Sequence, residues 1–309
     1  MSAQINVDLI DICLNKRRTH SKETIQKKNN QIKPETIFFR NELEVAETIR
    51  KIRYHQLRFD IIQKHSLLKV GEMDERVLNQ HEIEVSREIP KYILCEYPNE
   101  RRFEFWDFMM NLPTPKLAVL HLFDSFESLS NSIDILHQNG LYFYGLTPDN
   151  IAFDESLKPV LRNFGNNCFT FEQTPVFIEN IRDLEYKPLD CHVLSYLLNN
   201  KCASLSLSII EEICDNYLIK TNNTATRLEC VEYLNRFINK PVSFITDELM
   251  KQSDKWDKIS LAMVFLGVGE PRFPYDLREP RFPYDPSFHA FLKISMLDSP
   301  DTVEPQDYT

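Results

Sequence analysis

The placement of glycine restricts this chain more than any other feature of its composition. Glycine occurs six times in 309 residues, and Gly71 is the only one among the first 139. A phosphate-binding loop of the GxGxxG or GxxxxGK type needs clustered glycines, because backbone amides must approach the phosphate closely. The N-terminal part of the chain therefore cannot form a glycine-rich nucleotide loop.

The charge balance argues against nucleic acid and anionic membranes as partners. The chain carries 36 Lys and Arg against 46 Asp and Glu, a net charge of −10, so no overall positive field attracts phosphates. Its longest apolar run, 261–267, is far below the roughly 18 residues that a spanning helix needs. The N-terminus is too polar for a secretory signal. We expect a soluble, cytoplasmic protein without a membrane or nucleic-acid partner.

The cysteines indicate neither a metal site nor a disulfide framework. There are seven, an odd number, and none of them are spaced as CxxC. A structural zinc site usually has paired ligands two to four residues apart. We therefore expect buried thiols in a reducing compartment.

The first third of the chain predicts an arm, one amphipathic helix and several strands. Residues 1–35 are polar and contain a basic run, which indicates a solvated arm. Apolar residues recur at helical spacing over 38–52. Strand-like patterns follow at 57–62, 66–70 and 91–97.

The remainder of the chain is predicted to be mainly helical. A long amphipathic pattern over 115–138 ends at Asn139-Gly140, a typical C-cap. Two short strands, 151–153 and 159–161, flank a turn. Further helices are expected at 101–112, 190–200, 205–219, 224–238 and 256–266. A tandem repeat, EPRFPYD, begins at residues 270 and 279 and receives no functional assignment.

The stretch 137–165 carries the chemistry. It reads HQNGLYFYGLTPDNIAFDESLKPVLRNFG, and it resembles the catalytic core of the protein kinase family, H-R-D-L-x-x-x-N followed by D-F-G. The resemblance aligns Asn150 with the metal-binding asparagine and Gly145 with the catalytic aspartate. It aligns Asn163, Phe164 and Gly165 with the D-F-G triplet.

Other fragments match the same family in the same order. RNELEVAETIRKI resembles helix αC, with Glu42 at its ion-pairing glutamate, and KYILCEYP resembles the strand that enters the hinge. WDKISLAMVFL resembles the D-x-W-S-L-G helix, with Asp257, Ser260 and Leu261 matching. SMLDSPDTV resembles the closing L-x-x-D-P-x-x-R element, although Val303 replaces the arginine.

The resemblance implies an α+β, two-lobed kinase-like fold. It places a reduced N-lobe at 36–98 and a mostly helical C-lobe at 99–309, with a long insertion at about 166–254. The segments FWDF and YKPLDCHVLSYL further resemble divergent kinase-like proteins of giant DNA viruses. That narrower resemblance implies a viral or virion-associated protein in the host cytoplasm.

Several departures from the family pattern predict weak or absent catalysis. Gly145 has no side chain to accept a substrate proton, and the neutral amide of Asn163 is a poor ligand for Mg²⁺. The lysines before Glu42, Lys27, Lys28 and Lys33, do not lie in a strand-like run. Asp149 is the nearest substitute for a lost carboxylate. The cofactor-binding residues, Glu42, Asn150 and Asn163, and the metal ligands among them, Asn150 and Asn163, would then be vestigial.

One further departure concerns regulation. Tyr144 replaces the arginine that would pair with a phosphorylated activation loop, so the sequence predicts that this switch is missing.

Three functions remain open. The first is a pseudokinase scaffold that binds protein partners through 166–254 and requires no cofactor. The second is an active, atypical serine/threonine kinase that uses ATP with Mg²⁺ and relocated carboxylates. The third is an assembly protein whose kinase resemblance is accidental. Fold determination separates the third from the others, and nucleotide binding with phosphate transfer separates the first two.

Overall fold

The fold is α+β, with helices and small antiparallel sheets. The computed structural model describes residues 30–34, 36–69, 91–98, 102–110, 115–165, 168–170, 184–221 and 226–266. The chain divides into two compact units, the first comprising Met1–Pro113 with Asp149–Cys168 and the second Thr114–Pro148 with Phe169–Thr309. The tandem repeat and Val303 lie outside the described residues.

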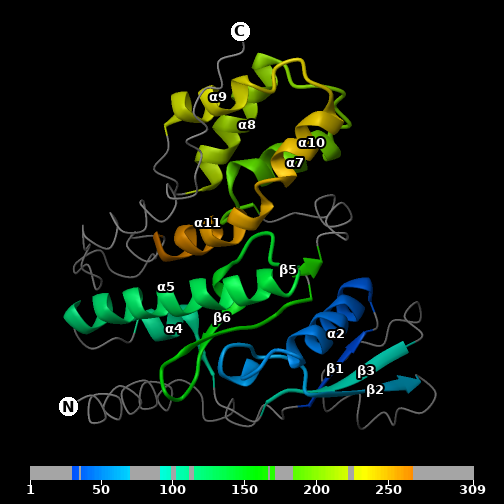
Figure 1. Cartoon of the computed structure of the whole chain (residues 1–309), viewed down its shortest axis with the longest axis vertical. Helices are drawn as coiled ribbons and strands as arrows, with labels where there is room; N and C mark the ends of the chain where they lie inside the picture. The colour runs from blue at the N-terminus through cyan, green and yellow to red at the C-terminus, as the bar shows by residue number, and fades with distance from the viewer. Residues whose placement is uncertain are drawn as a thin grey trace. The chain divides into compact units, whose positions relative to one another are not determined.

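A three-stranded antiparallel sheet forms one part of the first unit. Its strands are β1 (Asn30–Pro34), β2 (Lys64–Lys69) and β3 (Lys91–Glu96), in the order β1-β3-β2. Helix α2 (Ile37–Arg50) follows β1 in the chain and lies against this sheet (Figure 1). The strands predicted at 66–70 and 91–97 are confirmed, whereas the segment 30–34 is a strand rather than part of a solvated arm.

Helix α2 begins and packs as its sequence predicts. The Thr36 hydroxyl accepts a hydrogen bond from Phe39 N at 3.1 Å, which satisfies one free amide of the first turn. The apolar side of the helix then packs on the sheet in a small core. That core consists of Phe39, Ile62, Ile93 and Cys95, with Leu43 and Tyr97 packed against it.

A second sheet in the same unit carries the hairpin of residues 151–161. It consists of β4 (Phe103–Glu104), β6 (Ile151–Phe153) and β7 (Pro159–Leu161), in the order β4-β6-β7. Helix α4 (Phe105–Met110) packs on it, and the Phe108 ring stacks on Phe153 with centroids 3.7 Å apart. Both strands of the predicted hairpin are confirmed.

The strand predicted at 57–62 is wrong. Residues His55–Leu57 form the 3-10 helix η1, and only Phe59 pairs with a strand residue, through an isolated bridge to Leu161. The Arg50 guanidinium lies within hydrogen-bond distance of the Ile62 carbonyl. The segment is therefore a packed loop. Its apolar residues are buried as those of a strand would be, but it forms no ladder of hydrogen bonds with a neighbouring strand, and the apolar pattern alone does not distinguish the two cases.

The second unit is mostly helical. Helix α5 (Pro115–Gln138) has the predicted bounds, and Gly140, at φ +72°, closes it by donating from its amide to the His137 carbonyl. A two-residue ladder joins β5 (Leu141–Tyr142) to β8 (Phe169–Thr170). Helix α11 (Ser253–Leu266) packs alongside α5 (Figure 1).

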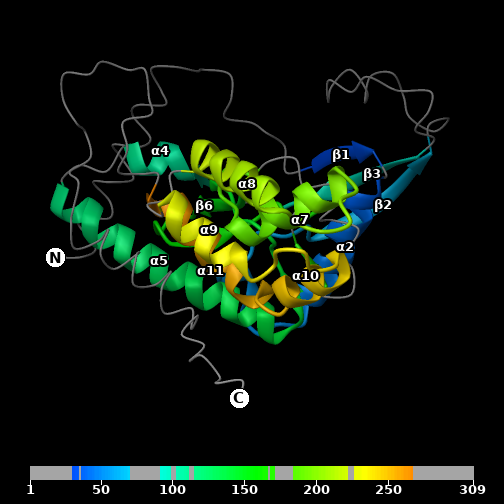
Figure 2. The same ribbon diagram turned by 90° about the horizontal axis from the view of Figure 1, so that it is seen from above.

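The helices of the predicted insertion pack on one another (Figure 2). Helices α7 (Leu189–Asn199), α8 (Leu207–Lys220) and α9 (Arg227–Asn235) confirm the predicted ones, whereas α10 (Val242–Met250) was not predicted. Buried Asp190 ties three helices together, because it accepts hydrogen bonds from the Tyr233 hydroxyl at 2.9 Å and Trp256 Nε1 at 3.0 Å. Among the described helices, none combines the length and apolar character required to cross a bilayer.

Candidate functional site

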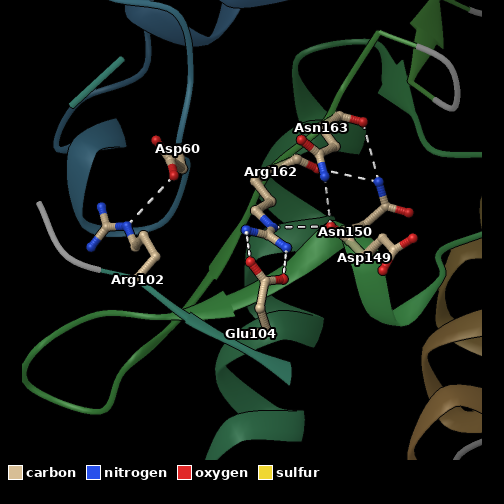
Figure 3. Close-up of polar contacts among 7 residues, drawn as sticks. All are labelled: Asp60, Arg102, Glu104, Asp149, Asn150, Arg162 and Asn163. Carbon is tan, nitrogen blue, oxygen red and sulfur yellow. Dashed lines mark hydrogen bonds and ion pairs between the residues drawn. The ribbon is translucent and has the colours of Figure 1, made fainter. Parts of the chain in front are cut away.

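The side chains of two asparagines cross-link the ends of the β6–β7 hairpin in the first unit. Asn150 lies in the 3-10 helix η3 (Pro148–Asn150), directly before β6, and Asn163 follows β7. Asn150 Nδ2 donates to the carbonyls of Arg162 and Asn163, both at 3.2 Å, and Asn163 Nδ2 donates to the Asp149 carbonyl at 2.8 Å (Figure 3). The structure thus brings together the two residues that the sequence aligns with metal ligands.

The donor atoms of this pair are arranged for backbone contacts. Each amide nitrogen faces a backbone carbonyl, and Asn163 adopts φ +57°, a left-handed conformation that asparagine tolerates better than most residues. A carboxylate at 163 would have no hydrogen to donate to the Asp149 carbonyl. Asp149 itself has an exposed side chain and uses its backbone oxygen here.

The residues present at this hairpin do not fit a resident Mg²⁺ ion. Mg²⁺ in phosphate-transfer sites is usually held by one or two carboxylates together with substrate phosphates, whereas the pair here consists of neutral amides bonded to the backbone. Within the described part of the chain, no group of three or more His, Cys, Asp or Glu side chains could hold a metal ion. Asp149 as a substitute carboxylate stays a prediction.

An arginine that the sequence analysis missed braces the same hairpin. Arg162 Nε donates to the Asp149 carbonyl at 3.0 Å, and its two terminal nitrogens bind both carboxylate oxygens of Glu104 (Figure 3). A two-point pair of this kind fixes geometry better than a single contact. A second ion pair, Arg102 with Asp60 at 3.6 Å, lies in the same unit.

Asn41 joins helix α2 by hydrogen bonds to the chain around residues 163–165, the N-F-G segment. Its Nδ2 donates to the Gly165 carbonyl at 3.1 Å and to the Cys168 carbonyl at 2.7 Å, while its side chain is buried. Gly165 lies so close to the helix that an added Cβ would come within 3.0 Å of the Phe38 carbonyl oxygen and of Glu42 Cβ. Asn41 shares a stripe with the buried Val45 and Ile49 at i, i+4 and i+8, a spacing that could have identified it as a buried polar residue.

The predicted ion-pairing residue, Glu42, binds a tyrosine. The Tyr97 hydroxyl donates to Glu42 Oε1 at 3.1 Å. Burial, followed by the adjacent Glu42 carboxylate, raises the pKa of the Tyr97 phenol far above its ordinary value. Tyr97 therefore stays a neutral donor at any physiological pH.

The position of Lys33 corrects one expectation. Lys33 lies on strand β1, at the register position opposite Ile93 of β3, so a lysine does occur on the strand that precedes α2. The residues around it, NQIKP, alternate too briefly to predict a strand, and its pairing with a distant strand supplies the missing stability.

In the second unit, Asp257 anchors the segment that contains Gly145. Asp257 Oδ2 accepts a hydrogen bond from Phe143 N at 2.7 Å and from His137 Nε2 at 2.8 Å. His137 thus binds a carboxylate on α11, in addition to lying in the last turn of α5. Gly145 adopts φ +119°, a conformation that residues with a side chain rarely adopt.

Aromatic rings surround Tyr144, the residue that the resemblance aligns with an arginine. The Tyr144 ring lies 6.0 Å from Tyr142 and 6.2 Å from Phe169, in stacked orientation, and 5.7 Å from Trp256 at an edge. Tyr144 is buried and adopts φ +44°. A buried aromatic ring cannot pair with a phosphate as an arginine would; the loss of the switch stays a prediction.

Comparison with known proteins leaves the family open. No protein-family model matches this chain, and no curated protein has a significantly similar sequence.

Proposed function

We propose that this chain is a kinase-like protein that lacks phosphoryl-transfer activity and acts as an interaction scaffold. The observation that carries the proposal is the set of hydrogen bonds made by the side-chain amides of Asn150 and Asn163. The two residues aligned with metal ligands meet across the hairpin, where their amide nitrogens donate to backbone carbonyls and neither side chain carries the negative charge of a carboxylate.

Contacts between separately matched fragments support the kinase-like part of the proposal. In the first unit, helix α2, which resembles αC, contacts the N-F-G segment: Asn41 donates a hydrogen bond to the Gly165 carbonyl, 124 residues later in the chain. In the second unit, Asp257 of the D-x-W-S-L-G-like helix binds Phe143, 114 residues earlier. Both contacts are expected if the fragments are arranged as the kinase resemblance implies.

The sheet of the first unit supports the same conclusion. Strand β1 with Lys33, helix α2 with Glu42, and strands β2 and β3 follow one another in the chain. Strand β3 pairs with both β1 and β2 and lies between them in the sheet. The resemblance requires a lysine before the αC-like helix, and Lys33 lies on the strand at that place.

The second unit supports the scaffold part of the proposal. Four large apolar side chains are substantially exposed on its helices α8, α9 and α10: Leu207, Ile219, Leu228 and Phe244. Ile219 is 80% exposed and Leu228 66%, and in this proposal these two side chains contact the partner protein. The giant-virus resemblance extends the proposal to a virion-associated role.

Nucleotide binding and phosphate transfer test the catalytic part. The full chain is mixed with ATP, with and without Mg²⁺ or Mn²⁺, and its melting temperature and phosphate transfer to itself and to casein are measured. A ligand at 100 times its Kd would add about 2.7 kcal/mol, roughly 5–10 °C. We expect no metal-dependent rise and no transfer.

A metal-dependent rise together with transfer would establish the active-kinase alternative. The Glu42→Gln variant would then lose the rise in melting temperature, whereas Glu44→Gln, an exposed position on the same helix, would keep it.

The scaffold part is tested by proximity labelling in cells that produce this protein. The double variant Ile219→Glu/Leu228→Glu should fail to label partner proteins that the control variant Lys251→Glu, at an exposed lysine, still labels. If both variants label the same proteins equally, the proposed contact through Ile219 and Leu228 is contradicted.

A further inference from the structure

A buried lysine occupies the space in front of Gly145. Lys187 precedes helix α7 and is only 4% exposed. A Cβ added to Gly145 would lie 2.8 Å from Lys187 Cγ and 3.0 Å from Cε, and its closest neighbour would be Nζ. The lysine side chain therefore crosses the face of residue 145 from which a side chain would project.

The amino group of the lysine also contacts the backbone of Gly145. Lys187 Nζ donates a long hydrogen bond of 3.5 Å to the Gly145 carbonyl. This contact places a lysine amino group, rather than a carboxylate, beside the residue that the kinase resemblance aligns with the catalytic aspartate.

We propose that Lys187 fills the space beside position 145: its side chain occupies the place into which a side chain at residue 145 would project. Gly145 and Lys187 form one coupled pair, because the glycine makes room for the lysine and the lysine fills the space beside the glycine. The chemical meaning of this arrangement rests on the proposed function, whereas the packing of the pair does not.

A second glycine in the same unit provides a matched control. Gly140 also adopts a positive φ, +72°, but nothing lies within 4 Å of a Cβ added to it. Alanine at Gly140 thus reports backbone strain alone. Alanine at Gly145 reports strain together with the collision against Lys187.

A thermal unfolding cycle on the full chain tests the coupling. We expect Gly140→Ala to lower the melting temperature by about 2–4 °C and Gly145→Ala to lower it by about 4–10 °C. In a Lys187→Ala background the effect of Gly145→Ala should become smaller, and the loss that remains should be the backbone strain at φ +119°. In a background with Lys220→Ala, an exposed lysine, the effect should stay unchanged.

An equal effect of Gly145→Ala in all three backgrounds would overturn the proposal. Amine labelling of the unmodified protein, read by mass spectrometry, gives a second test that needs no folded variant. Lys187 should react at least tenfold more slowly than exposed Lys220, and equal rates would also overturn the proposal. Neither measurement involves nucleotide, so a failure here is distinct from a failure of the proposed function.

Discussion

The hydrogen bonds of Asn41 give the sharpest prediction for the first unit. Its Nδ2 donates to two carbonyls, of Gly165 and Cys168, at a buried position. In Asn41→Ala both bonds are lost and both carbonyls lose a buried donor, each at about 1–2 kcal/mol. Part of this is regained, because Asn41 Oδ1 is buried without a hydrogen-bond partner in the native protein. We expect a net loss of about 2–3 kcal/mol.

Asn41→Asp adds a pH dependence to the same test. The introduced carboxylate has the shape of the amide but faces two carbonyl oxygens, so we expect a loss at neutral pH of at least about 3 kcal/mol. Burial and the carbonyls raise the pKa of the introduced carboxyl above its unfolded value. The folded state then binds the proton more tightly, so the variant regains stability as pH falls through the folded pKa towards 4.

Denaturant unfolding at pH 4.5 and pH 7.5 measures both effects, and native-state hydrogen exchange locates them. Exchange at Gly165 and Cys168 should accelerate in both variants, while Glu44→Gln, at an exposed position on α2, should match the wild type. The reasoning is refuted if Asn41→Asp is as stable as the wild type at pH 7.5, or if its deficit is the same at both pH values.

Three further predictions concern other contacts. Burial lowers the pKa of His192 to about 4, so stability should fall by about 3 kcal/mol between pH 6.5 and 4; urea titrations should show His192→Gln reducing this dependence. Gly165→Ala places a Cβ 3.0 Å from the Phe38 carbonyl oxygen and should cost about 1–3 kcal/mol in chemical denaturation; no loss would contradict the close approach. Asp257→Ala removes the acceptor of Phe143 N and should lower the melting temperature by about 4–8 °C, whereas Asp257→Asn should lose less.

Local pattern was sufficient to predict the elements whose stability is local. Helix α5 has the predicted bounds, because its apolar stripe and the Asn139-Gly140 cap act within a few residues. The strands β6 and β7 follow from a turn between two short apolar runs, and Asp154 holds that turn by accepting from Ser156 N at 2.8 Å. Local pattern failed at 30–34, where a strand forms by pairing with β3, and at 57–62, where apolar residues pack from a loop.

The sequence alone also selected the candidate site residues, and the tertiary structure decided what each of them contacts. Residue type and order drew attention to Glu42, Gly145, Asn150 and Asn163. Their partners, among them Tyr97 and Lys187, belong to distant segments, and no local pattern specifies such a pairing. Lys33 became part of a strand only because β3 offers it a ladder. Folding thus gives these residues their chemistry, since burial and a partner set the hydrogen bonds and charge of each group.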